Sequence, residues 1–128
     1  MQQIALSMPD VNEEDIAAVT AVLRTPQLSL GPKLREFEAA VAAYVGTKEG
    51  VAVNSGTSAL HLAMRGFGIQ DGDEVITTPF SFIASSNCIL FERAKPMFVD
   101  IVPTTLCIDP DKVEAAITPR TKAILAVD

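Results

Sequence analysis

Apolar residues recur every three or four positions through the first fifty residues of the chain, which predicts two amphipathic helices. The apolar positions are Ile16, Val19 and Leu23 in the first helix and Leu34, Phe37, Val41 and Tyr44 in the second. Asp10 and Glu13 have the spacing of a capping pair at the start of the first helix. The segment 25–32 contains two prolines and breaks this helix, and Gly46 is expected to end the second one.

The pattern changes at residue 51, where short apolar runs of strand length begin to alternate with helical stretches. The predicted strands cover residues 51–53, 74–78, 96–100 and 123–127, and the predicted helices cover residues 57–67, 80–92 and 110–117. The first of these helices has its apolar face at Leu60, Ala63, Met64 and Phe67. Turn residues 71–73 lead into the second strand, and Asp109 with Pro110 opens the last helix. Strands alternating with helical crossovers predict an α/β fold with a mostly parallel sheet.

The first predicted strand and the helix after it are joined by the tight turn Asn54-Ser55-Gly56. The first backbone N–H groups of a helix have no acceptor within the helix, and the helix dipole adds partial positive charge there. The small residues Ser55, Gly56 and Ser58 would let an anion approach these groups closely. The arrangement predicts a site for a phosphate-bearing ligand; the alternative is that the serine only caps the helix and the glycine only forms a turn.

Three other residues are candidates for a functional role. Phe82 follows the second predicted strand, on the side of a parallel sheet where the phosphate turn also lies, so its ring could stack on a flat ligand. The alternative is a core phenylalanine, a role for which Phe80 is the stronger candidate. His61 is either a ligand neighbour or, as its place inside the helix favours, a partly buried residue with satisfied polar atoms. Asp100 is either a buried acid with a shifted pKa or a polar residue that closes a strand.

Composition narrows the class of protein further. With 128 residues and 48% hydrophobic content, the chain is long enough for one domain with a substantial core. A net charge of -6 without a run of lysines and arginines argues against nucleic acid as a partner. No apolar run is long enough to cross a bilayer and the first ten residues lack a signal peptide's features, so we expect a cytoplasmic protein without a membrane partner. Two cysteines and one histidine exclude a disulfide framework and a Cys/His zinc site, and no metal site is predicted.

Several longer segments of the chain occur in a specific order. They are GPKLREFEAAVAAYVGTK, VAVNSGTSALHLAM, GDEVITTPFSFIASSNCI and KPMFVDIVPTTLCIDPDKVEAAITPRTKAILAVD. In sequence and spacing they resemble the N-terminal part of the DegT/DnrJ/StrS family of nucleotide-sugar aminotransferases, which are similar to fold-type I enzymes that use pyridoxal 5′-phosphate (PLP). The resemblance implies that residues 1–50 form an N-terminal helical arm and residues 51–128 the first part of the PLP-binding large domain.

The resemblance also implies roles for individual residues. Gly56, Thr57 and Ser58 would hold the cofactor phosphate through backbone N–H groups and side-chain hydroxyls. Phe82 would stack on the pyridine ring, because a flat, electron-poor ring suits an aromatic face. The segment 28–31 would lie near the interface of a homodimer and the mouth of the active site.

Two features depart from the family pattern. Arg93 stands where the family usually has a glycine before Ala94, a change that bears on the conformation of a turn. The family's Schiff-base lysine and the acid that pairs with the pyridinium nitrogen would lie beyond Asp128, so no catalytic residue is predicted in this chain. We therefore expect a fragment, in which the strand 51–53 lacks its neighbour, the family's seventh strand, while strands two to four lie together.

The activity implied for the complete enzyme is transfer of an amino group from an amino-acid donor such as glutamate to a keto sugar linked to a nucleotide. One alternative is a PLP-dependent sugar dehydratase of the same family, which has a histidine in place of the lysine. The other is a non-catalytic fragment that binds PLP or supports dimerisation.

Overall fold

The computed structural model describes residues 7–127, in which the chain forms five helices and three strands. The chain separates into two compact units, Met1–Ala52 and Val53–Asp128. Residues 1–6, which belong to the predicted arm, and residue 128 lie outside the described residues. Within residues 7–127, every helix is too short or too polar to cross a lipid bilayer.

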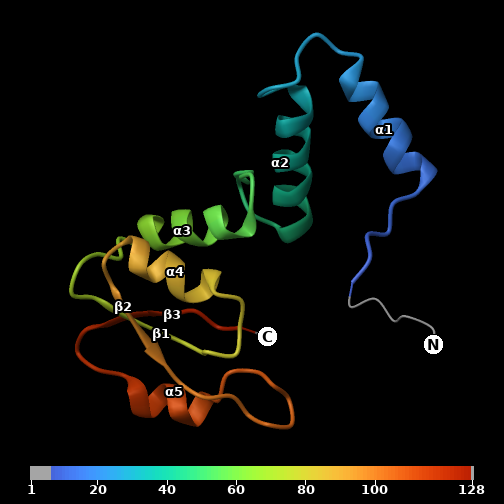
Figure 1. Cartoon of the computed structure of the whole chain (residues 1–128). Coiled ribbons are helices and arrows are strands. Elements are labelled where there is room, and N and C mark those ends of the chain that lie inside the picture. Colours follow the sequence, from blue (N-terminus) through green and yellow to red (C-terminus); the bar gives the residue numbers. More distant parts are fainter. Residues whose placement is uncertain (1–6, 128) are drawn as a thin grey trace, which may run out of the picture. The chain divides into compact units, whose positions relative to one another are not determined.

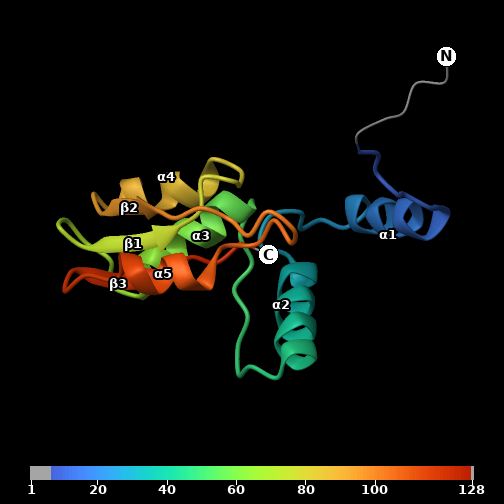
Figure 2. The ribbon, with the colours of Figure 1, turned by 90° about the horizontal axis from the view of Figure 1, so that it is seen from below.

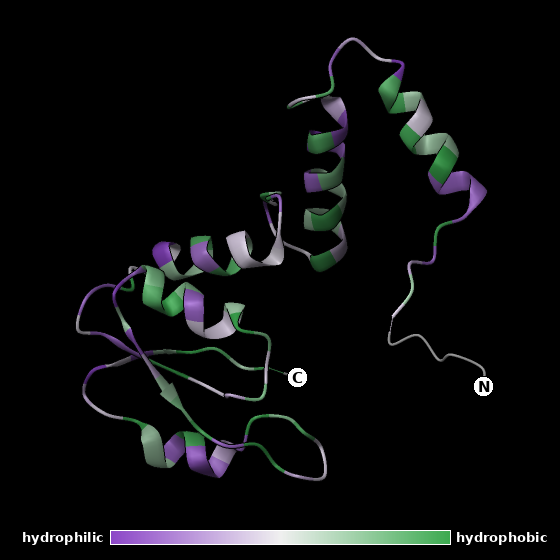
Figure 3. Ribbon diagram, viewed as in Figure 1, coloured by the Kyte–Doolittle hydropathy of each residue, from purple (hydrophilic) through white to green (hydrophobic). Residues whose placement is uncertain are grey.

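The first unit contains the two helices that the apolar spacing predicts, α1 (Glu13–Leu23) and α2 (Pro32–Val45). α1 has a hydrophilic first turn followed by mostly hydrophobic residues (Figure 3). No residue of α1 is buried, and Ala42 is the buried residue of α2. α2 ends at Gly46, as predicted, with a left-handed φ of 74° that glycine adopts without steric cost. Most of the apolar surface of both helices is therefore exposed in this unit.

The N-terminal cap of α1 differs from the predicted pair, Asp10 and Glu13. Asn12 is the capping residue, and its Oδ1 accepts the N–H groups of Glu14 at 2.8 Å and Asp15 at 3.2 Å. In return, the Asn12 N–H donates to Oδ2 of Asp15 at 3.0 Å. The spacing of the predicted pair is therefore right and its position is wrong, because asparagine caps a helix as well as aspartate does.

Residues 51–53 do not form the predicted strand. Val51 is 80% exposed, and the N–H of Ala52 donates to the Glu38 carboxylate at 2.9 Å instead of to a neighbouring strand. A strand needs a hydrogen-bonded neighbour, and the strand pairs found in residues 7–127 do not include this segment. The apolar run alone is not enough to form a strand.

The second unit is built on a parallel sheet of three strands in the order β2-β1-β3. The strands are β1 (Glu74–Thr77), β2 (Lys95–Phe98) and β3 (Thr121–Ile124), and the helices are α3 (Gly56–Gly66), α4 (Ala84–Phe91) and α5 (Pro110–Ala116). Figure 1 shows α3 and α4 on one face of the sheet and α5 on the other. The predicted α/β fold is confirmed, and the second, third and fourth predicted strands lie together as expected.

The central strand β1 is buried along its whole length, because helices cover both faces of the sheet. Val75 faces the core beneath α3 and α4. This core consists of Met64, Ile69, Val75, Cys88, Ile89 and Ala94. Burial raises the pKa of the Cys88 thiol, so this side chain packs as a small neutral group.

Several predicted boundaries shift. β2 and β3 begin one and two residues earlier than predicted, in register with β1. α4 begins at Ala84 instead of residue 80, and the N–H of Phe80 bonds to the Thr78 side chain. Phe67 is the C-cap of α3 and is exposed, so its predicted place on the apolar face is wrong.

α3 ends in a Schellman motif, a turn in which two N–H groups bond back to carbonyls of the last helical turn. The N–H of Ile69 donates to the Met64 carbonyl at 3.1 Å, and the N–H of Gly68 donates to the Arg65 carbonyl at 3.0 Å. Gly68 has the left-handed φ of 68° that the motif requires. Since Met64 and Ile69 both belong to the core, the turn is fixed by buried contacts.

α4 ends in the same motif with an arginine in the glycine position. The N–H of Ala94 donates to the Ile89 carbonyl at 3.3 Å, and the N–H of Arg93 donates to the Leu90 carbonyl at 2.9 Å. Arg93 has a φ of 60°, a conformation that costs an L-residue with a side chain roughly 1–2 kcal/mol. Ala94 and Ile89 are both in the core, so burial holds the turn in the conformation that suits glycine.

We expect Arg93→Gly to stabilise the protein by about 0.5–1 kcal/mol, because relief of the left-handed strain exceeds the extra backbone entropy of glycine in the unfolded chain. Arg93→Ala is the matched control, since it removes the same charge and keeps Cβ; its expected effect is within about 0.5 kcal/mol of zero. Denaturant unfolding of both variants measures the difference. Equal stabilisation by the two variants would show that charge, and not strain, is responsible.

Candidate functional site

The turn before α3 is closed by three polar side chains. Ser55 is the N-cap of α3, and its Oγ accepts the N–H of Ser58 at 3.1 Å. The Ser58 hydroxyl donates to Oδ1 of Asn54 at 2.8 Å and lies 3.0 Å from the Ser55 hydroxyl. The helix begins at Gly56, one residue earlier than predicted. These contacts fix the first turn of α3.

The free hydrogen-bond donors of this turn belong to Gly56 and Thr57. Neither their N–H groups nor the Thr57 hydroxyl has a partner among residues 7–127. A Cβ added to Gly56 would meet no atom within 4 Å, so the space beside these donors is open. Two N–H groups and a hydroxyl that can donate, at the positive end of an 11-residue helix, fit a phosphate group. Ser58 differs, because its N–H and its hydroxyl are both bonded within the turn.

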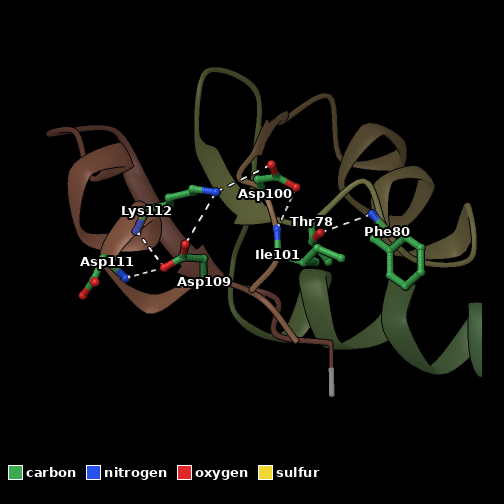
Figure 4. Close-up of polar contacts among 7 residues, drawn as sticks. All are labelled: Thr78, Phe80, Asp100, Ile101, Asp109, Asp111 and Lys112. Carbon is green, nitrogen blue, oxygen red and sulfur yellow. Dashed lines mark hydrogen bonds and ion pairs between the residues drawn. The ribbon is translucent and has the colours of Figure 1, made fainter. Parts of the chain in front are cut away.

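Phe82 lies in the loop between β1 and α4, whose backbone is held on both sides. Buried Thr78 accepts the N–H of Phe80 through Oγ1 at 3.2 Å (Figure 4), and the N–H of Ser85 donates to the Phe82 carbonyl at 3.1 Å. The Phe82 side chain is 75% exposed. It is therefore not a core residue in this chain, and its ring is accessible to a ligand.

Phe80 is 56% exposed, so its predicted place in the core is wrong. The loop leaves β1 at Thr78 and turns away from the sheet before the helix begins, which carries the Phe80 ring outward. A shallow depression of about 340 Å³ is lined by Pro79, Phe80 and Ser81. The aromatic residues of this loop thus form part of the surface near the start of α4.

The turn before α3 and the Phe82 loop lie at the same end of the sheet. Figures 1 and 2 show the N-terminal ends of α3 and α4 at the end toward which the parallel strands run. Loops at the carboxyl ends of parallel strands are the usual ligand site of open α/β sheets. The structure thus brings Gly56, Thr57, Ser58 and Phe82 to the end of the sheet where a ligand would be expected.

Asp100 and Lys112 lie at the same end, after β2 and at the start of α5 (Figure 4). Asp100 is exposed, and its carboxylate accepts the N–H of Ile101 at 2.9 Å. This bond, followed by the charge of Lys112, lowers the pKa of Asp100. The Lys112 ammonium lies 3.5 Å from the carboxylates of both Asp100 and Asp109. Of the two roles considered for Asp100, the geometry supports that of a polar residue closing the strand.

His61 is a partly buried residue with a satisfied ring nitrogen, as its place in the helix favours. Its Nε2 lies 2.6 Å from the Glu92 carboxylate, and its ring meets the edge of Phe91 with 5.0 Å between ring centroids. Arg65 lies 3.6 Å from the same carboxylate. These contacts link α3 to the end of α4 and give His61 a structural role.

Sequence reasoning misses Asn54 as a partner of Ser58, whereas a capping role for Ser55 is one of the two alternatives that the sequence leaves open. The Ser55 contact has a local signal, since an N-cap serine regularly accepts the N–H three residues on. The Asn54 contact spans the turn and depends on the backbone path between residues 54 and 58, which composition does not specify. It became visible only in the structure.

These features define an α/β protein whose candidate site offers unpartnered hydrogen-bond donors and an accessible aromatic ring at one end of a parallel sheet. Residues 9–128 match the DegT/DnrJ/EryC1/StrS aminotransferase family, and the chain belongs to this family. The chain corresponds to the N-terminal portion of its members and spans 31% of the length of a curated relative, the spore coat polysaccharide biosynthesis protein SpsC of Bacillus subtilis. The two sequences are 51% identical over 121 residues, which is 94% of this chain.

Solved structures show the same relation. PseC of Helicobacter pylori, an aminotransferase involved in the biosynthesis of pseudoaminic acid, is 38% identical with a TM-score of 0.90, over 99% of this chain and 34% of PseC. NtdA of Bacillus subtilis, solved with the bound cofactor PMP, is 42% identical with a TM-score of 0.80, over 87% of this chain and 26% of NtdA. The fold of this chain is that of the N-terminal part of sugar aminotransferases.

Proposed function

We propose that this chain is the N-terminal part of a PLP-dependent aminotransferase. In the complete enzyme, an amino group would pass from an amino-acid donor such as glutamate to a keto sugar linked to a nucleotide. Membership of the aminotransferase family supports the reaction, and the names of PseC and SpsC support a sugar as the acceptor. We assign residues 1–50 to a helical arm and residues 51–128 to the first part of the PLP-binding large domain.

The cofactor phosphate would be held at the first turn of α3. Gly56 and Thr57 supply free N–H groups, Thr57 adds a hydroxyl, and Ser58 completes the turn. Phe82 would pack its exposed ring against the pyridine ring. Bound there, the cofactor would supply an electron sink for the amino transfer. The observation that carries the proposal is the set of unpartnered donors at α3, in a chain whose relative NtdA contains PMP.

This chain's residues would bind and orient the cofactor, while the lysine that carries it would lie outside residues 1–128. Lys112, at the same end of the sheet as the donors, lies 3.5 Å from the carboxylates of both Asp100 and Asp109 and is not assigned this role. We also propose that the complete enzyme is a homodimer. The exposed apolar residues of α1 and α2, among them Val19, Phe37 and Tyr44, support this assignment because such surfaces commonly pack against a partner.

The test uses the complete gene product incubated with PLP. We expect a visible absorbance band that persists through gel filtration, and borohydride reduction should fix the cofactor to one lysine outside residues 1–128, located by peptide mapping. Glutamate should then convert the bound cofactor to its amino form. Failure to retain PLP would contradict the proposal, and attachment to a lysine of this chain would contradict the assigned division of roles. A histidine in place of that lysine would favour the dehydratase instead.

A further inference from the structure

Asn54 lies immediately before the proposed phosphate turn and has a contact that the proposed function does not use. Its Oδ1 accepts the Ser58 hydroxyl at 2.8 Å across four residues of chain. Ser58 in turn lies 3.0 Å from the Ser55 hydroxyl, which also accepts the Ser58 N–H. The three side chains form a short hydrogen-bonded chain beside the free donors of Gly56 and Thr57.

The number of available protons fixes which group donates in each of these side-chain hydrogen bonds. A hydroxyl has one proton to donate, and that of Ser58 goes to Asn54. The 3.0 Å contact between the two serines therefore uses the Ser55 proton, with Ser58 Oγ as the acceptor. In this arrangement Ser58 has no proton left for a ligand. A phosphate dianion accepts hydrogen bonds and donates none, so it could bind the Ser58 hydroxyl only if the bond to Asn54 is given up.

We infer that Asn54 is a positioning residue for the proposed phosphate site: it holds the Ser58 hydroxyl in the free turn and releases that proton when an anion binds. The side-chain amide can serve both arrangements because it carries an acceptor and two donors. Turned about its last bond, Asn54 would donate Nδ2–H to Ser58 Oγ, and the Ser58 hydroxyl would point to the phosphate. This inference rests on the proposed function.

Substitutions of Asn54 differ in which of the two hydrogen-bond arrangements they allow. Aspartate can accept the Ser58 proton and cannot donate, so it would hold Ser58 in the free state, and its charge would repel a phosphate. Alanine can do neither and leaves Ser58 without its partner. We therefore expect Asn54→Asp to impair phosphate binding more than Asn54→Ala does.

The experiment uses the complete gene product freed of cofactor, and it measures the dissociation constants of PLP and of pyridoxal, which lacks the phosphate. The ratio of the pyridoxal dissociation constant to the PLP dissociation constant, compared between variants, isolates the contribution of the phosphate. Asn54→Ala should lower this ratio about fivefold, the effect of losing the neutral hydrogen bond that orients the Ser58 hydroxyl, with pyridoxal binding unchanged. Asn54→Asp should lower it further. The affinity for inorganic phosphate, measured by competition with PLP, should fall in the same order.

A double variant tests whether Asn54 acts through Ser58. Asn54→Ala combined with Ser58→Ala should bind PLP as Ser58→Ala alone does, within about twofold, whereas independent effects would multiply. Gln70→Ala, which removes an exposed amide side chain elsewhere in the same unit, is the control and should change nothing. An unchanged ratio in Asn54→Ala, or multiplying effects in the double variant, would overturn the inference. A ratio near one in the unaltered protein would instead overturn the proposed phosphate site, and the inference with it.

Discussion

Gly56→Leu should abolish retention of PLP by the complete gene product, with a loss of affinity of about a hundredfold or more. Gly56 is the first residue of α3, and its free N–H is one of the groups proposed to donate a hydrogen bond to the phosphate. A leucine side chain would occupy the open space beside this N–H and keep the phosphate from approaching it. Equilibrium binding of PLP, followed by absorbance, measures the effect.

The structure indicates that this substitution changes the proposed site without disturbing the fold. A Cβ at Gly56 meets no atom of the chain within 4 Å, and the backbone there is not in the left-handed region, so the variant should fold normally. Gly66→Leu is the matched control, because Gly66 is a helical glycine of the same helix with equally open surroundings. Its PLP affinity should stay unchanged. Normal retention by Gly56→Leu would place the cofactor phosphate elsewhere in the protein.

Glu74→Gln should lower the melting temperature by several degrees at neutral pH. The Glu74 side chain is 1% exposed and is held by two residues from the segment before β3. The Thr118 hydroxyl donates to Oε2 at 2.6 Å, and Nε of Arg120 donates to Oε1 at 3.1 Å. A glutamine amide has one acceptor oxygen, so an N–H group would face one of these donors. A buried donor without an acceptor is destabilising.

The pH dependence of this effect has a definite sign. The hydrogen bonds from Thr118 and Arg120 lower the pKa of Glu74 in the folded state below its ordinary value of 4.5. The carboxylate therefore stabilises the fold fully above pH 4.5, and this contribution is lost as the pH falls through the lowered pKa. The melting temperatures of the unaltered protein and of Glu74→Gln should converge under acid conditions. Glu114→Gln, at an exposed position of α5, is the control and should melt like the unaltered protein at every pH. A constant difference between the Glu74 variant and the unaltered protein down to acid pH would contradict this role of the carboxylate.

Glu74 also shows where sequence reasoning ends. The sequence predicts a strand from this residue onward, and an acid at its start has no local reason to be buried. Its partners lie 44 and 46 residues further along the chain. They meet it because β3 pairs beside β1, with an irregular register between Glu74 and Val75. Only the pairing of strands brings these charges together.

The errors at the candidate site have a related cause. The sequence predicts the helix, its small first residues and an aromatic residue after the next strand, all of which depend on local spacing. Exposure of Phe80 and Phe82 depends on where the loop leaves β1, which is set by the contact between Thr78 and the Phe80 N–H. Periodicity counts apolar residues and does not distinguish a ring that faces the core from one that faces solvent.

Taken by itself, the sequence determines the alternation of helices and strands, the parallel sheet, the glycine that ends α2 and the family to which the chain belongs. These follow from local spacing, turn residues and ordered motifs. The tertiary structure decides that residues 51–53 are not a strand, that Arg93 adopts a glycine conformation, and that Ser58 is bonded to Asn54. Each of these depends on which groups are available as neighbours, and neighbours exist only once the chain has folded.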